Sequence, residues 1–346
     1  MSQSPDARSQ TPQSPIRVER SASSRQRLCV AAPNPVADDV RRRISPKPSA
    51  SSPRRLRLKT ETIIRILTIS ALAGLLGAVG LRLKLAQVTE SLKKCRFTPI
   101  LLANFIVVPA LAVGAARMFG LGRETAIAMI LLAAAPFAPG VPVCARMARA
   151  DLALAAGLTT GFAVLSAFLT PIACEIALKA VPDAGAIRFN LVGVLLTLVA
   201  TITVPLAVGM TINHQRPALG QRLLRPVEVV SEAIGALSLA FVTITEFGAI
   251  LQTGWQSLLA MGLVAELSLG LGYWLGGGSA GSRQVVALGT SNRNIALALL
   301  VAVQGFAGTL VMSAVVANGL LLILLGLLHV AWWRFVVAAD VRRRIP

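Results

Sequence analysis

The chain is poor in acidic residues, aromatic residues and histidine. Its 346 residues include 15 Asp and Glu against 34 Lys and Arg, one Tyr and two His. The four cysteines show no C-x-x-C spacing, and His214 lies far from His329 in the sequence. These absences argue against a disulfide framework and against a metal site. No segment resembles a nucleotide-binding loop or a catalytic triad, so we expect neither an enzyme nor a cofactor.

Apolar residues dominate what is present. They make up 55% of the chain against 14% charged residues, and the apolar runs are longer than soluble cores use. A transmembrane helix needs about 20 predominantly apolar residues. The sequence therefore predicts an all-α polytopic membrane protein with nine to ten transmembrane helices, and nine segments meet the length requirement: 62–84, 99–119, 123–147, 151–177, 187–212, 228–250, 255–277, 282–305 and 307–335.

The net charge of +19 has a topological explanation. The basic residues lie in an N-terminal tail and in short loops, where the positive-inside rule accounts for them without nucleic acid as a partner. We expect membrane lipid to surround the spans. The basic loops all fall on one side of the predicted helices, which we assign to the cytoplasm: 82–96, 146–149, 216–225 and 334–344.

Two tails flank the membrane domain. Residues 1–60 are rich in Ser, Pro and Arg and are predicted to be disordered. The transporter domain is expected over 61–336, and a short basic cytoplasmic tail over 337–346. We place the protein in the inner or plasma membrane of a cell. An organelle envelope is the alternative if the Arg- and Ser-rich tail is a transit peptide.

Two of the predicted helices are interrupted. Gly289 and the polar residues 290–294 interrupt the segment 282–305, and a cluster of helix breakers interrupts the segment 123–147: Pro136, Pro139, Gly140 and Pro142. Transporters with inverted repeats place such discontinuous helices at corresponding positions, and their breaks meet near the bilayer midplane. We infer one repeat over about 62–177 and a second over about 187–335. The first break lies in the third helix of its half and the second in the fourth, so the first half lacks its opening helix.

The second break is the predicted substrate site. Arg293 stands there inside an apolar segment, with polar neighbours on both sides: Thr290, Ser291, Asn292 and Asn294. An intramembrane guanidinium needs a partner or a ligand, and the N-termini of half-helices add positive potential. The alternative is that Arg293 only neutralises a buried acid or reaches the interface. The pattern indicates a site for a carboxylate, a sulfonate or a similar anion.

One acid falls in the middle of a predicted span. Glu266 lies midway along the helix 255–277 and is expected deep in the bilayer. It is a candidate ion-pair partner of Arg293, and alternatively a proton-coupling carboxylate. Glu232 and Glu246 lie nearer helix ends and are expected to be solvated or to cap helices.

Several motifs resemble the bile acid:sodium symporter family over roughly residues 62–335. The strongest block reads Ala-Arg-Ala-Asp-Leu-Ala-Leu at 148–154, followed by Gly157 to Thr159 and by Leu169 to Pro171. Further resemblance lies at 104–109, at 270–273, and at Gly289 with Asn292. The resemblance implies a ten-helix fold in which a core domain carries the crossed helices and packs against a panel domain.

The sodium ligands that the resemblance implies are mostly replaced. Thr159 is unchanged, and Asn104 stands where the family offers Gln, so these two residues form a candidate cation site. The family's other ligand positions fall on Val141, Pro142, Ala155, Ala287 and Ser291. Sodium prefers several oxygen ligands and a carboxylate. The coupling ion, Na⁺ or H⁺ if there is one, therefore stays open.

The sequence as a whole indicates a secondary transporter that moves a small organic anion by alternating access, as the resemblance implies. The replaced ligand positions argue against sodium coupling as in the family. The alternatives are an uncoupled or proton-coupled facilitator, and a membrane receptor on the same fold that does not transport.

Overall fold

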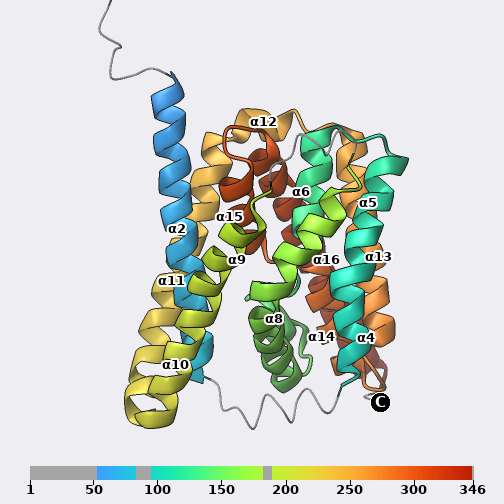
Figure 1. Ribbon diagram of the computed structural model, residues 1–346. Helices are drawn as coiled ribbons and strands as arrows, with labels where there is room; N and C mark the ends of the chain where they lie inside the picture. The colour runs from blue at the N-terminus through green and yellow to red at the C-terminus, as the bar shows by residue number, and fades with distance from the viewer. Residues whose placement is uncertain (1–52, 83–94, 182–188, 345–346) are drawn as a thin grey trace, which may run out of the picture. The chain divides into compact units, whose positions relative to one another are not determined.

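The computed structural model describes residues 53–82, 95–181 and 189–344, and the regular elements in this part of the chain are all helices (Figure 1). Eight of them are long and apolar enough to cross a membrane. The prediction of an all-α polytopic membrane protein is thereby confirmed. The spanning elements of the first half are α2 (Pro53–Arg82), α4 (Phe97–Leu102) with η1 (Ala103–Val107) and α5 (Val108–Met118), and α8 (Leu152–Leu178).

The second half begins with a helix in three parts and contributes five spanning helices. They are α9 (Leu191–Leu198) with η3 (Val199–Thr203) and α10 (Val204–Gln215), α11 (Pro217–Thr245), α13 (Trp255–Leu275), α14 (Ala280–Ser291) with α15 (Ile295–Gly305), and α16 (Val311–Arg344). The short helix α12 (Phe247–Leu251) links α11 to α13.

The predicted span 123–147 is two short helices, α6 (Arg123–Ala133) and α7 (Val141–Ala148). The predicted N-terminal tail lies outside the described residues up to residue 52, and α2 begins within its last part, at Pro53. At the other end, α16 continues to Arg344 through most of the predicted basic tail.

Proline produces the same local feature in two spanning helices. Pro109 and Pro205 each follow a valine at the start of a helical part, and a five-residue π-helix precedes each of them: η1 and η3. Because proline has no N–H, it cannot donate to the carbonyl one turn earlier, and the chain widens locally. Such π segments are frequent at functional sites.

Three helices form one side of the membrane domain. In Figure 1, α2, α10 and α11 lie side by side, and α4, α5 and α13 lie on the far side of α8, while α15 packs against α2. Glycines allow the close approach of α2 and α10: a Cβ atom on Gly209 would lie 2.9 Å from the amide nitrogen of Leu81 and 3.1 Å from the carbonyl carbon of Gly80. Small residues serve this purpose in membrane helix packing. We call α2, α10 and α11 the panel.

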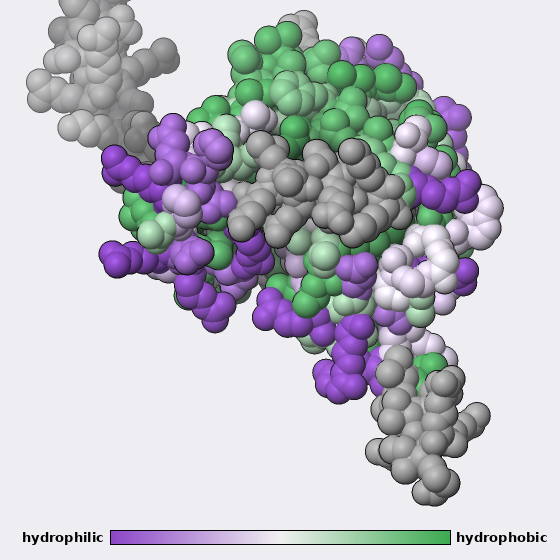
Figure 2. Space-filling model, turned by 90° about the horizontal axis from the view of Figure 1, so that it is seen from below, coloured by the Kyte–Doolittle hydropathy of each residue, from purple (hydrophilic) through white to green (hydrophobic). Residues whose placement is uncertain are grey.

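One end of the molecule is hydrophilic. The C-terminal end of α2 and the turn between α10 and α11 lie at the same end in Figure 1, and Figure 2, which views that end, shows hydrophilic side chains gathered there. Three arginines of these segments are exposed: Arg82, Arg216 and Arg225. The positive-inside rule predicts that this end faces the cytoplasm.

The glycine contact between α2 and α10 gives a first testable prediction. Gly209→Ala should lower the thermal unfolding midpoint of the detergent-solubilised protein, because the added methyl group meets the α2 backbone. Gly114→Ala is the matched control. Its Cβ would meet nothing within 4 Å, and alanine favours a helix by about 1 kcal/mol over glycine. Equal midpoints for the two variants would contradict the close packing.

Candidate substrate site

The two broken helices cross and pair through their main chains. The segments between α6 and α7 and between α14 and α15 leave backbone groups outside helices, and such groups must be satisfied inside a membrane domain. Three main-chain hydrogen bonds join the first segment to the last turn of α14 and to the second segment: Phe137 N to Gly289 O at 3.2 Å, Ala138 N to Asn292 O at 3.1 Å, and Asn294 N to Ala135 O at 2.8 Å. The predicted meeting of the two breaks is thus observed.

Phe137 holds this crossing in place. It is a buried residue with a left-handed backbone (φ 52°), a conformation that is costly for an aromatic residue. Its ring stacks on Phe162 of α8 at 4.2 Å between centroids. A Cβ on Gly289 would fall on the Phe137 ring. Glycine at 289 is therefore required by the close approach of the two segments.

Two helices begin at the crossing. Pro136, Pro139 and Gly140 lie in the segment before α7, Pro142 lies in the first turn of α7, and Asn294 caps α15 by accepting a hydrogen bond from Leu297 N at 3.0 Å. The first helix is thus interrupted where these residues predicted it. Gly289 differs, because it lies inside α14, and the second interruption falls at residues 292–294. The free N–H groups and the dipoles of α7 and α15 give the crossing a positive potential.

Arg293 lies inside the protein rather than at the interface. It is only 4% exposed, and its Nη1 donates to Asn104 Oδ1 at 3.1 Å. The Asn104 amide group in turn donates to Thr290 Oγ1 at 3.2 Å and to Ile100 O at 2.8 Å. Asn104, on the π segment η1, thus orients the guanidinium through its oxygen.

The guanidinium has no counter-charge among the described residues. Its Nη2 is buried and has no hydrogen-bond partner there, and no described carboxylate forms an ion pair with it. A buried cation without a partner is costly. The site therefore favours an anion that supplies the missing charge.

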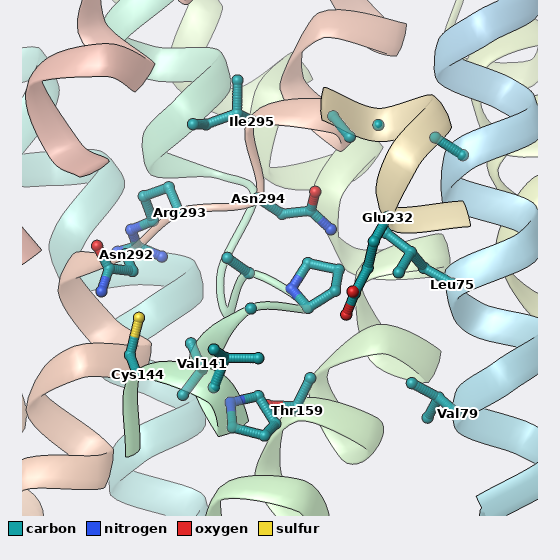
Figure 3. Close-up of a pocket in the computed structure, with 18 of the residues that line it drawn as sticks. Leu75, Val79, Val141, Cys144, Thr159, Glu232, Asn292, Arg293, Asn294 and Ile295 are labelled. Carbon is teal, nitrogen blue, oxygen red and sulfur yellow. The ribbon is translucent and has the colours of Figure 1, made fainter. Parts of the chain in front are cut away.

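A cavity of about 840 Å³ lies between the crossing and the panel. Residues of α2 and α11 form one wall, and the crossing, α7 and α8 form the other. Figure 3 shows the two walls, with Leu75 and Val79 on α2, Asn294 at the crossing and Thr159 on α8. Because the Asn294 oxygen caps α15, its Nδ2 remains for a ligand. A drug-sized organic molecule fits this volume.

The predicted substrate residues divide into two groups. Asn292, Arg293 and Asn294 line the large cavity. Thr290 is fully buried and bound to Asn104, and Ser291 donates to Ala265 O at 3.1 Å. Arg293 and Ser291 also line a second, small cavity of about 20 Å³, which has room for one water molecule.

The two residues of the predicted cation site, Thr159 and Asn104, do not line the same cavity. Thr159 lines the large cavity, whereas Asn104 is absent from its lining and accepts from Arg293 instead. The oxygen that the amide would offer to a cation is thus already occupied by a guanidinium.

The expected ion pair between Glu266 and Arg293 does not form. Glu266 points to the outside of α13, where its Oε2 lies 3.2 Å from Nε2 of His329 on α16 and its side chain is 46% exposed. Helix α13 is apolar on nearly all sides, so the sequence does not indicate which side faces the protein. The prediction used only the position of Glu266 along the helix, and it therefore assigned Arg293 as the partner in place of His329.

Sequence reasoning missed one group in the cavity. Glu232 of α11 is exposed and lines the large cavity, where Figure 3 shows its side chain projecting from the panel wall. The predicted span began at residue 228, so Glu232 stood near its end. In the structure α11 begins at Pro217, which moves Glu232 to the middle of the helix. The other acid, Glu246, accepts from Ser313 Oγ at 2.6 Å.

Crossed discontinuous helices beside a cavity are the architecture of secondary transporters. The comparisons with known proteins agree. The family model described as the sodium bile acid symporter family matches residues 69–255, and the chain belongs to this family. The match includes the first broken helix and ends before the second. A search of curated proteins gave no match. The protein is a membrane transporter of the bile acid or organic anion type.

A double-mutant cycle tests the partner of Arg293. Asn104→Ala alone should destabilise the protein, because it leaves a buried guanidinium and Thr290 with unmet hydrogen bonds. In the Arg293→Met background the same change should cost less, with a coupling free energy of about 0.5–3 kcal/mol. The measurement is unfolding in a denaturing detergent titration. The control cycle pairs Glu266→Ala with Arg293→Met and should show additivity. A coupling free energy found only between Glu266 and Arg293 would contradict Asn104 as the partner of Arg293 and make Glu266 the partner.

Proposed function

We propose that the protein transports a small organic anion, with a carboxylate or sulfonate group, by alternating access across the inner or plasma membrane of a cell. The anionic group binds at the crossing, beside Arg293 and the amide of Asn294. The apolar part of the substrate lies along the panel wall of α2 and α11.

The observation that carries this proposal is the buried guanidinium without a counter-charge. Arg293 lines the large cavity and keeps one nitrogen unpaired among the described residues. Guanidinium groups recognise carboxylates and similar anions through directed, charge-assisted hydrogen bonds. The N-termini of α7 and α15 favour the same charge at the same place.

The position of the cavity supports alternating access. It lies between the panel and the crossing. A movement of one group of helices against another around a fixed site is the general mechanism of transporters with this architecture.

The arrangement favours transport that does not require sodium. Asn104 Oδ1 accepts from Arg293, and alanine occupies position 287, where the family resemblance implies a carboxylate. A guanidinium fixed beside the substrate supplies positive charge without a bound metal cation. Few side-chain oxygens remain for sodium.

Uptake into proteoliposomes tests the role of Arg293. Arg293→Gln should reduce the uptake of the anion about 10- to 100-fold, the loss expected for a charge-assisted hydrogen bond. The assay offers radiolabelled taurocholate and pyruvate as a large and a small organic anion. The matched control is Arg283→Gln, because Arg283 is exposed and binds Gly277 O at the end of α13. Unchanged uptake in Arg293→Gln would remove Arg293 from the site.

Ion replacement tests the sodium prediction. Exchanging external sodium for potassium or choline should leave the initial rate of anion uptake unchanged. Thr159→Ala should also take up the anion at the same rate with and without sodium, because Thr159 holds no coupling cation in this proposal. A sodium-dependent rate that Thr159→Ala abolishes would contradict the proposal and restore a cation site at this residue.

A further inference from the structure

We propose that Glu232 is the proton-binding group of this transporter and that the protein moves an organic anion together with a proton. The inference rests on the proposed function, since it assumes that the large cavity binds an anion. Its basis is the juxtaposition of an unpaired carboxylate on the panel wall and a fixed cation on the crossing.

Glu232 is available to bind a proton from the cavity. Its side chain is exposed, lines the cavity and projects into it opposite the crossing (Figure 3). It forms no ion pair or hydrogen bond with the described residues, in contrast to its neighbour Glu228, whose Oε1 lies 2.6 Å from Nη2 of Arg82. The two acids lie one helical turn apart on α11, and of these two only Glu228 pairs with a cation.

The other charged groups around the cavity are few. Two helices packed against α11 line the cavity. The charged lining residue of α2 is Arg82, which forms an ion pair with Glu228. The lining residues of α16 are uncharged: Leu322, Ile323, Gly326 and Leu327. Neither α10 nor α12 contributes a described lining residue. Across the cavity stand Arg146 of α7 and Arg293 at the crossing. Arg146 therefore counts among the cations that Glu232 faces.

Electrostatics links the proton to the substrate. An ionised carboxylate repels an anion bound in the same cavity, and the repulsion disappears when the carboxylate takes up a proton. By linkage, a bound anion favours the proton on Glu232 to the same extent that the proton favours the anion. The proton comes from water on the side to which the cavity is open. It leaves as the anion leaves, when the cavity opens to the other side.

Glu266 does not offer this coupling. Its carboxylate lies on the outer surface of α13 beside His329 and does not line the cavity. A proton bound there does not meet the substrate. Glu266 therefore provides a matched control, since it is the same residue type in a spanning helix of the same repeat.

The experiment measures anion accumulation driven by a pH gradient. Sodium-free proteoliposomes, acidic outside, are offered radiolabelled taurocholate or pyruvate, and internal pyranine records the proton that enters. The wild type should accumulate one of these anions above its external concentration, with internal acidification. Glu232→Gln should lose the accumulation at least about 10-fold and lose the acidification, but still exchange labelled for unlabelled anion. Glu232→Asp and Glu266→Gln should keep both.

Three results would overturn the inference. The first is accumulation by Glu232→Gln equal to the wild type, and the second is loss of anion exchange in this variant, which would make Glu232 a binding or folding residue. The third is a wild type that takes up anion without responding to the pH gradient. Arg293→Gln is run in parallel and tests the proposed function separately. If Arg293→Gln still exchanges the anion, the proposed anion site is wrong. If Arg293→Gln loses anion exchange and the wild type takes up the anion independently of pH, only the proton coupling is wrong.

Discussion

Main-chain groups exposed in the interior of a membrane domain need partners, and this requirement determines the centre of the protein. Two helices are broken by proline, glycine and polar residues, and each break satisfies the other through three hydrogen bonds. The close approach requires glycine at 289 and holds Phe137 in a left-handed conformation against Phe162. As a result, α7 and α15 begin at one point, and their N-termini make that point suitable for an anion.

The crossing also explains how a charged residue is accommodated. Arg293 is held by Asn104, which lies on a π segment produced by Pro109, and its remaining nitrogen faces no described acceptor. The cost of that arrangement in the empty state becomes binding free energy when an anion arrives. The same guanidinium lies against the amide oxygen that the family resemblance offers to a cation. The guanidinium of the proposed anion site therefore also occupies one oxygen of the candidate cation site.

The sequence predicted eight of the nine proposed spans, the interruption within 123–147 and a second interruption that contains Arg293, because apolar length, proline and a charge in an apolar run act locally. It did not predict the partner of Arg293, since Asn104 is 189 residues away and the contact depends on tertiary packing. It also gave Glu266 the wrong partner and did not indicate that Glu232 lines the cavity. The uniformly apolar α13 gave no indication of which side Glu266 faces, and the true start of α11 at Pro217 placed Glu232 in the cavity. The large cavity itself depends on the packing of the panel against the crossing.

The central claim is that Arg293 and Asn294 bind the anionic group of a substrate. The most direct measurement is a crystal structure of the protein with a brominated organic carboxylate that it transports, in which anomalous scattering locates the ligand. The account predicts that the carboxylate lies within hydrogen-bond distance of the Arg293 guanidinium or the Asn294 amide, with the bromine toward α2 and α11. A carboxylate bound elsewhere, with Arg293 still unpaired, would contradict it.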